Sequence, residues 1–235
     1  MVIASIFVNP TQFAANEDLD SYPSDIEGDI AKLNQAGADA VFLPKPTDIY
    51  DDGPSVSVSI PDLSMQLCGA SRPTHFSGVC QVVLKLFGLV QCDVAVFGQK
   101  DFQQLAIIRR LVEDLFLPIE IIAGDIVREP DGLAMSSRNV YLNASHRSQA
   151  TVLSKSLKAM LSAVQSGETD VETLYETGRS VIATAPDAEL DYLEIVHKRT
   201  LNALSLNDAI TDGHALMAVR FGQTRLIDNI AFDLE

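Results

Sequence analysis

Short apolar runs and longer helical patterns follow one another along the first 125 residues of the chain. The apolar runs, rich in β-branched residues, predict buried strands at residues 2–8, 40–43, 93–98 and 119–124. Apolar residues spaced three and four apart predict the intervening helices, at about 24–36, 76–90 and 101–116. Strand and helix in alternation predict an α/β fold with a parallel, doubly wound sheet and right-handed crossovers.

Local signals set the limits of two segments in this part of the chain. Ser24, followed three residues later by Glu27, is the pattern of a capping box, and Gly37 is placed to end the first helix. Residues 53–75 show no periodicity except in "SVSVSI", residues 55–60, which alternates like an edge strand. We therefore expect an irregular segment before the second helix.

The pattern changes past residue 142. Two helices are predicted in succession, at 144–165 and about 170–184, and two or three strands follow. The last two, "HALMAVRF" and "RLIDNI", flank "GQT", a short Gly-containing link that suits a hairpin. We place a domain boundary near residue 143, with an α/β domain over 1–143 and a small α+β domain over 144–235.

Composition and charge narrow the classes of protein. Of the 235 residues, 47% are hydrophobic, which is enough for substantial cores. With 17 basic against 32 acidic residues, the net charge of −15 opposes nonspecific binding to nucleic acid or anionic lipid. No apolar run approaches 18 residues, and no charged stretch precedes an apolar one at the N-terminus. We expect a cytoplasmic protein without nucleic-acid or membrane partners.

The cysteines and histidines do not have the spacing of a metal site. Cys68, Cys80 and Cys92 form no Cys-x-x-Cys pair, and the four histidines form no His-x-x-x-His. We therefore expect three reduced thiols and no zinc site.

Two loops at strand ends carry residues suited to a small substrate. In "NPTQF", after the opening strand, the amide of Gln12 either fixes a hydroxy acid or serves only as a turn residue. In "FGQKDFQQL", Gly98 lets a ligand approach the backbone and Lys100 supplies a cation. Asp101 either caps the following helix or accepts a hydrogen bond from a ribose hydroxyl.

A third loop, "REPDGLAMSSRNVYL", groups two hydroxyls and a guanidinium at Ser136, Ser137 and Arg138. Such groups suit phosphate oxygens, and in a chain this acidic their grouping favours a phosphate site. Arg72 and His75, in "SRPTHF", either add donors or belong to an ordinary surface loop with a helix cap.

Six collinear motifs resemble those of the pantothenate synthetases, which are pantoate-β-alanine ligases: "SIFVNPTQF", "YPSDIEGD", "GASRPTHFSGV", "FGQKDFQQL", "REPDGLAMSSRNVYL" and "RLIDNI". The resemblance runs from residue 3 to the end of the chain. The family is similar to the Rossmann-like nucleotidyltransferases, which include the class I aminoacyl-tRNA synthetases. The resemblance therefore implies a Rossmann-like domain over 1–143, a smaller lid domain over 144–235 and assembly as a homodimer.

The resemblance implies a reaction in two steps. ATP and pantoate first give pantoyl adenylate and pyrophosphate, and β-alanine then attacks the adenylate to release pantothenate and AMP. Because a carboxylate is a poor electrophile, such an enzyme aligns it with the α-phosphate and stabilises charge on the phosphates. Mg²⁺ would accompany the ATP phosphates.

The resemblance also implies roles for particular residues. Gln12 and Gln104 would bind pantoate, and Gln12 would also lie near β-alanine. The implied ATP-binding residues are Gly98, Gln99, Lys100, Asp101, Val127, Met135, Ser136, Ser137 and Arg138. Lys100 would contact the phosphates, Asp101 the ribose and Val127 the adenine, while 135–138 would form a mobile phosphate loop. The implied catalytic set is Lys100, Ser136, Ser137 and Arg138, and Asp29 is a candidate helper at the metal.

The chain departs from the family pattern in two places. Gln99 stands where the family usually has glutamate. Family members also begin with a further strand and a Met-Gly-x-Leu-His-x-Gly-His motif that contacts the ATP phosphates, a motif that contains none of His75, His146, His197 and His214. In a sheet of order 3-2-1-4-5 that strand is central. The chain alone is therefore expected to be poorly soluble or slow in turnover. An extension of about 50 to 60 residues that carries the strand and the histidine motif is expected to restore solubility and turnover.

Two other functions stay open at this point. A noncatalytic protein could keep the pantoate or ATP contacts and regulate or pair with another subunit. Another adenylyl- or cytidylyltransferase would share the fold and turn over a different acid. An open frame that encodes the histidine motif upstream of Met1 would favour the ligase.

Overall fold

A computed structural model describes residues 1–13, 19, 22–51, 56–205 and 208–233. The chain divides into two compact units, Met1–Asp93 and Val94–Glu235. The predicted boundary near residue 143 does not coincide with this division, because the segment that begins at Val94 makes contacts with the C-terminal strands. A functional boundary near residue 143 stays a prediction.

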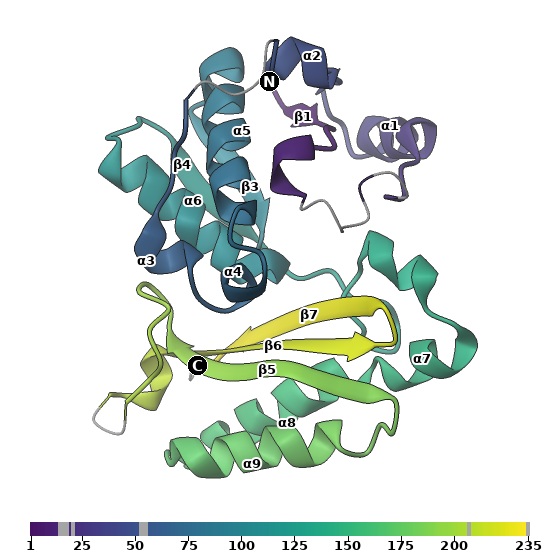
Figure 1. Cartoon of the computed structure of the whole chain (residues 1–235), viewed down its shortest axis with the longest axis vertical. Coiled ribbons are helices and arrows are strands. Elements are labelled where there is room, and N and C mark those ends of the chain that lie inside the picture. The colour runs from purple at the N-terminus through teal and green to yellow at the C-terminus, as the bar shows by residue number, and fades with distance from the viewer. Residues whose placement is uncertain (14–18, 20–21, 52–55, 206–207, 234–235) are drawn as a thin grey trace. The chain divides into compact units, whose positions relative to one another are not determined.

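The first unit is built on a short parallel pair of strands. β1 (Ile3–Ser5) pairs with β2 (Ala40–Phe42), and Ile3 lies opposite Ala40. Its helices are η1 (Pro10–Gln12), α1 (Ile26–Gln35), α2 (Pro46–Ile49), α3 (Pro61–Ser64), α4 (Cys68–Ser71) and α5 (His75–Val90) (Figure 1). The predicted strands, the first helix and the second helix are thus confirmed, although β1 is shorter than the predicted 2–8.

Two local predictions in this unit are wrong. The N-cap of α1 is Asp25 and not Ser24, since the Asp25 carboxylate accepts from the Gly28 N–H at 3.0 Å. Carboxylates at a helix start are also favoured by the helix dipole. Residues 56–60 form no strand; Ser55 lies outside the described residues. Alternating valines alone do not make a strand where no neighbouring strand pairs with them.

The helix α5 forms the apolar centre of the first unit. Its buried residues include Phe76, Val79, Val83 and Phe87. At Gly78 an added Cβ would lie 2.4 Å from the carbonyl oxygen of Thr11, so only glycine allows this close approach of α5 to η1. The loop after β1 is therefore packed directly on a helix.

The second unit begins with another parallel pair. β3 (Val94–Gly98) and β4 (Glu120–Gly124) pair along their full length, and η3 (Gln99–Asp101) with α6 (Phe102–Asp114) connects them. The predicted strands and helix are confirmed. The four parallel strands form two two-stranded sheets within the described ranges, and the parallel α/β class is confirmed.

The rest of the second unit is an antiparallel sheet covered by helices. Its elements are η4 (Ser137–Tyr141), α7 (Ala144–Gln149), α8 (Val152–Gln165), α9 (Val171–Ile182), β5 (Ala188–His197), η5 (Ile210–Asp212), β6 (Gly213–Phe221) and β7 (Thr224–Ala231). The predicted hairpin is confirmed, with Gly222 at φ +58° in its turn. The predicted helix 144–165 is instead two helices. At the break the Thr151 hydroxyl donates to the Ser148 carbonyl, a bond that competes with the helical ladder.

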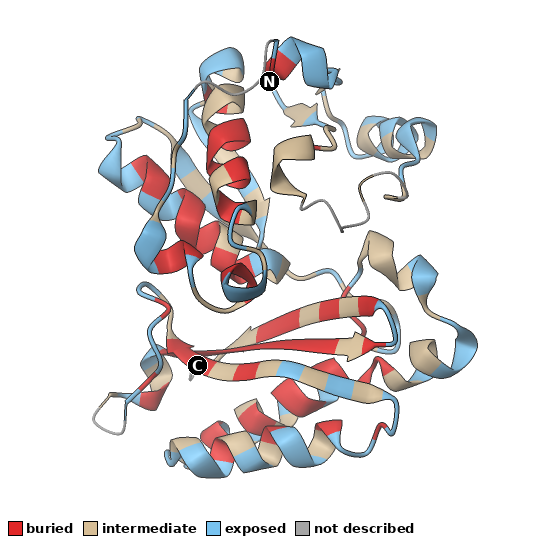
Figure 2. Cartoon of the chain, viewed as in Figure 1, coloured by how far each residue is buried: buried red, intermediate tan, exposed pale blue. Residues whose placement is uncertain are grey.

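The central strand of the three-stranded sheet, β6, is buried along almost its whole length, whereas β5 carries exposed residues near its start (Figure 2). Alternate residues of β6, among them Met217 and Val219, join the core formed with α8 and α9. On the other face His214 stacks on Phe102 of α6, with ring centroids 3.6 Å apart. The neighbouring strand β7 places two consecutive buried polar residues, Asp228 and Asn229, on opposite faces of this sheet.

No helix in the described part of the chain is long and apolar enough to cross a bilayer.

Candidate active site

The loop after β1 is held by a buried network around Asn9. The Asn9 amide donates to the Gly78 carbonyl at 3.1 Å, and its oxygen accepts from the Tyr50 hydroxyl at 2.8 Å and the Thr11 hydroxyl at 3.0 Å. Asn9 is 2% exposed, so these bonds replace water that it cannot reach. Burial raises the pKa of Tyr50, and its neutral hydroxyl stays a donor.

This network lies next to Gln12, the last residue of η1, and helps to fix its position. Its backbone carbonyl accepts from Arg72 at 3.3 Å and lies 2.8 Å from His75 Nδ1. Its side-chain oxygen lies 3.4 Å from the Asn9 amide. Arg72 and His75 therefore hold the loop that carries Gln12. The sequence offered them either as donors to a ligand or as part of an ordinary surface loop, and here they act as donors to the backbone of the Gln12 loop.

Two glycines lie side by side at the carboxyl ends of β3 and β4. Gly98 is paired in register with Gly124. A Cβ added at Gly98 would meet no atom of the described residues within 4 Å. The space beside the backbone is open at this strand end, and the binding of a ligand by Gly98 stays a prediction.

The η3 turn after Gly98 places three polar side chains at the start of α6. The ammonium of Lys100, the carboxylate of Asp101 and the amide of Gln104 have no hydrogen-bond or ion-pair partner among the residues that the structure describes. Asp101 occupies the N-cap position, yet its side chain makes no capping bond, so the capping interpretation is wrong. A cation and an acceptor are thus left available at the end of β3.

The third predicted loop lies between β4 and η4, where the chain folds back on itself like a hairpin; this segment, residues 125–136, is called the excursion below. Arg128 and Ala134 form an isolated antiparallel bridge, and the Met135 N–H donates to the Val127 carbonyl at 2.9 Å. The side chains of Val127 and Met135 are exposed. Ser136 caps η4 by accepting from the Arg138 N–H at 3.3 Å. Residues 135–138 therefore lie close together at the start of η4.

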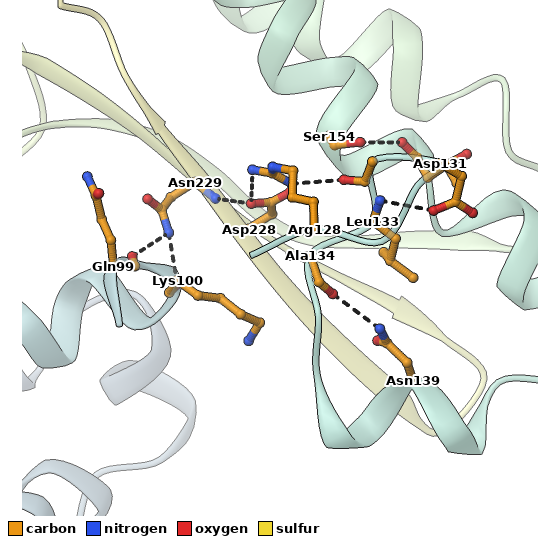
Figure 3. Close-up of polar contacts among 12 residues, drawn as sticks. Gln99, Lys100, Arg128, Asp131, Leu133, Ala134, Asn139, Ser154, Asp228 and Asn229 are labelled. Atoms are coloured by element: carbon orange, nitrogen blue, oxygen red, sulfur yellow. Dashed lines mark hydrogen bonds and ion pairs between the residues drawn. The ribbon is translucent and has the colours of Figure 1, made fainter. Parts of the chain in front are cut away.

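Asp228 of β7 anchors this excursion (Figure 3). Its carboxylate accepts two bonds from the Arg128 guanidinium, at 2.7 and 2.9 Å, and Arg128 also donates to the Gly132 carbonyl at 3.0 Å. The Asp228 side chain is only 1% exposed. A paired charge this deeply buried is costly to separate from its partner, so the excursion is fixed to β7.

The next residue, Asn229, anchors the η3 turn. Its amide nitrogen donates to the carbonyls of Gln99 at 3.1 Å and Lys100 at 2.8 Å (Figure 3). Its oxygen lies 2.8 Å from Nε2 of His214. β7 thus holds both of the predicted ATP loops, through two consecutive residues.

The protonation of His214 follows from these contacts. Backbone carbonyls can only accept, so the Asn229 amide nitrogen must face them and its oxygen must face His214, whose Nε2 then carries the proton. Nδ1 is buried and has no partner in the described part of the chain. Burial lowers the pKa of His214 to about 4, and the nearby charge of Lys198 lowers it further to a smaller extent. The hydrogen bond with Asn229 and the charge of Asp233 act in the opposite direction and raise it.

Asp29, the candidate metal helper, lies in the first turn of α1 and pairs with Lys32 at 3.1 Å. No group of three or more His, Cys, Asp or Glu side chains among the described residues is arranged to hold a metal ion. The role of Asp29 stays a prediction.

The residues that hold the loops in place were not predicted from the sequence. They are Asn9, Tyr50, Arg128, Asp228 and Asn229. One signal was available, because "RLIDNI" places an acidic and an amide side chain together inside an apolar strand. Polar residues on both faces of a buried strand need partners on both faces.

The comparisons with known proteins agree on one family. The family model of the pantoate-beta-alanine ligases matches residues 1–231. The pantothenate synthetase of Trichlorobacter lovleyi is 50% identical over 229 residues, a match that covers 97% of this chain and 80% of the relative. The chain belongs to the pantoate-beta-alanine ligase family. Another relative, the pantothenate synthetase of Pseudomonas putida, is 48% identical over 236 residues, a match that covers 100% of this chain and 81% of the relative.

Solved structures of ligases of this family share the fold. A crystal structure of the pantothenate synthetase from Thermus thermophilus matches 99% of this chain and 84% of that chain, with a TM-score of 0.94 and 43% identity. The pantoate-beta-alanine ligase of Francisella tularensis, in a complex with beta-gamma ATP and beta-alanine, matches with a TM-score of 0.76, 32% identity and 80% of that chain covered. The nucleotidyltransferase-like fold predicted from the sequence is thus confirmed.

The neutral state of His214 predicts a loss of stability in acid. The unfolded chain takes up a proton on this residue below its ordinary pKa of 6.5, whereas the folded chain does so only near 4. The free energy of unfolding should therefore fall as the pH drops from 6.5 towards 4, by about 3 kcal/mol from this residue. Urea unfolding of the protein and of His214→Phe at pH 7 and pH 4.5 measures the difference. Equal pH dependence of the two proteins would contradict it.

Proposed function

We infer that this chain catalyses the ATP-dependent condensation of pantoate with β-alanine, through pantoyl adenylate. The family membership supports the reaction. The observation that carries the site is the η3 turn, where the side chains of Lys100 and Asp101 have no partner in the described ranges and lie beside the open backbone of Gly98. A cation and an acceptor next to exposed strand-end backbone suit a triphosphate and a ribose.

Two displacements make up the reaction. In the first, a carboxylate oxygen of pantoate bonds to the α-phosphorus of ATP, and the bond from that phosphorus to the bridging oxygen breaks, which releases pyrophosphate. In the second, the neutral amine of β-alanine bonds to the acyl carbon, loses a proton and expels AMP. The negative charge that grows on the phosphates in the first step is what the protein must stabilise.

The side chains of the proposed ATP site contact different parts of the nucleotide. Lys100, Ser136, Ser137 and Arg138 supply donors to the phosphates, and they form the catalytic set. Asp101 accepts from the ribose hydroxyls, and the exposed side chains of Val127 and Met135 offer apolar surface to the adenine. The backbone of Gly98 and Gln99 completes the ATP site. The fixed loops supply orientation, which is the main requirement of phosphoryl chemistry without a covalent enzyme intermediate.

Pantoate binds through the amides of Gln12 and Gln104, and β-alanine lies near Gln12. An amide suits a hydroxy acid because it both donates and accepts. The Asn9 network supports this role by fixing the backbone on both sides of Gln12.

The remaining parts of the proposal concern the ion and the assembly. Mg²⁺ would be held mainly by the phosphates of the substrate ATP and would neutralise part of their charge, with Asp29 as the candidate helper. The protein works in the cytoplasm as a homodimer, and residues 144–235 act as a lid.

The phosphate loop predicts the first test. Arg138→Ala should slow adenylate formation by roughly 10² to 10³, the range for loss of one oriented charged donor. Pantoate-dependent exchange of labelled pyrophosphate into ATP measures this step, and AMP release on addition of β-alanine measures the whole reaction. Arg110→Ala is the matched control, because Arg110 pairs with Asp114 on an exposed face of α6. Exchange that is equally fast in Arg138→Ala would remove Arg138 from the site.

The pantoate site predicts a selective loss of affinity. Gln104→Ala or Gln12→Ala should weaken pantoate binding by roughly 1 to 3 kcal/mol, the cost of leaving a ligand group without its hydrogen bond, with little change for ATP. Calorimetric titration with each ligand separates the two affinities, and Gln35→Ala, on the exposed end of α1, serves as the control. Equal losses for pantoate and ATP would count against the assignment.

A further inference from the structure

We propose that Asn229 is a positioning residue, whose side chain fixes the η3 turn so that Lys100 faces the ATP phosphates. The proposal rests on the proposed role of Lys100 in binding ATP. Asn229 touches the backbone of the turn and no side chain that would meet a substrate, so it acts through another residue.

The donor capacity of the Asn229 amide is fully used on the turn. The nitrogen carries two hydrogens, and it has two acceptors, the carbonyls of Gln99 and Lys100. Asn229 is 2% exposed, so water cannot substitute for either bond. The carbonyl of Lys100 itself is the nearer acceptor, at 2.8 Å, and the side chain of Lys100 leaves the chain next to this anchored atom (Figure 3).

The orientation of the amide follows from its acceptors on one side and is matched by a donor on the other. His214 donates from Nε2 to the Asn229 oxygen, and its ring is stacked on Phe102 with an angle of 14° between the planes. A reversed amide would place oxygen against two carbonyl oxygens and two hydrogens against Nε2–H. The carbonyls of Gln99 and Lys100 therefore select this orientation, and His214, held in place by its stacking on Phe102, completes it as the donor to the amide oxygen.

The sheet does not require an amide at this position. The backbone of Asn229 is already paired with Leu216 in the β6–β7 ladder, and its N–H also reaches the Asp228 carboxylate at 2.8 Å. Leu216 lies directly opposite Asn229 on the same face of the sheet and Ala218 lies diagonally from it, and both are buried, so the packing of the sheet at this position does not by itself call for an amide. The amide is distinguished by its contact with the turn that carries Lys100.

The test is a double-mutant cycle on ATP affinity. Asn229→Asp keeps the shape of the side chain and removes both donors, and it should raise the dissociation constant of Mg-ATP by about 10-fold, the lower end of the range for residues that orient metal ligands from the outer shell. In a Lys100→Ala background the same change should raise it less than about 2-fold, because the group that it positions is gone. Calorimetry on the four proteins measures all the constants.

Two further variants separate positioning from general destabilisation. Ser156→Ala removes another buried donor to a backbone carbonyl, that of Gly178 at 2.8 Å, far along the chain from the turn, and it should leave ATP affinity unchanged. His214→Phe keeps a ring on Phe102 and removes the bond to Asn229. It should weaken ATP binding a few-fold with Lys100 present and not without it, which tests the proposal even if Asn229→Asp fails to fold.

The outcomes distinguish this proposal from the proposed function. An equal effect of Asn229→Asp in both backgrounds, or no effect in either, would overturn the positioning role. Unchanged ATP affinity in Lys100→Ala alone would overturn the assignment of Lys100 on which the proposal rests. Loss of affinity in Lys100→Ala, with none in Asn229→Asp and His214→Phe, would overturn the positioning role alone.

Discussion

The organisation of the nucleotide loops depends on two adjacent buried polar side chains in one strand. Asp228 and Asn229 are both 2% exposed, and successive residues of a strand point to opposite faces of the sheet. Asp228 therefore meets Arg128 on the face that packs on α8, while Asn229 meets the η3 turn on the face that packs on α6. A buried polar group without a partner costs free energy, so the strand is most stable with both loops in place.

This constraint explains how a loop-based site obtains a fixed geometry. Loops carry the reactive groups in α/β proteins, and they are mobile unless their backbone is tied down. Here the ties are hydrogen bonds to backbone carbonyls, at Gln99, Lys100 and Gly132. They leave the side chains of the loops for substrate. The same design appears in the first unit, where Asn9, Arg72 and His75 hold backbone atoms around Gln12.

Much of the fold and of the candidate site could be predicted from the sequence, because both depend on local patterns. Apolar periodicity located β3, α6 and β4, and the motifs "FGQKDFQQL" and "REPDGLAMSSRNVYL" indicated the nucleotide loops. The anchors could not be predicted, since Asn229 is separated from Lys100 by 129 positions and only the folded chain brings them together. The helix break at Thr151 and the cap at Asp25 were also missed, because several neighbouring residues could have served and tertiary packing selected one.

Hydrogen exchange measured by mass spectrometry tests most directly whether the two loops have separate anchors on β7. Asn229→Asp should raise exchange at least about 10-fold in a peptide covering 99–106 and leave one covering 128–138 unchanged, whereas Asp228→Asn should do the reverse. The bonds of Asp228 and Asn229 to the loops involve no residue of α8, so the exchange of the α8 amides gives the internal reference for global stability. Faster exchange in both peptides with either variant, or in neither peptide, would contradict the account.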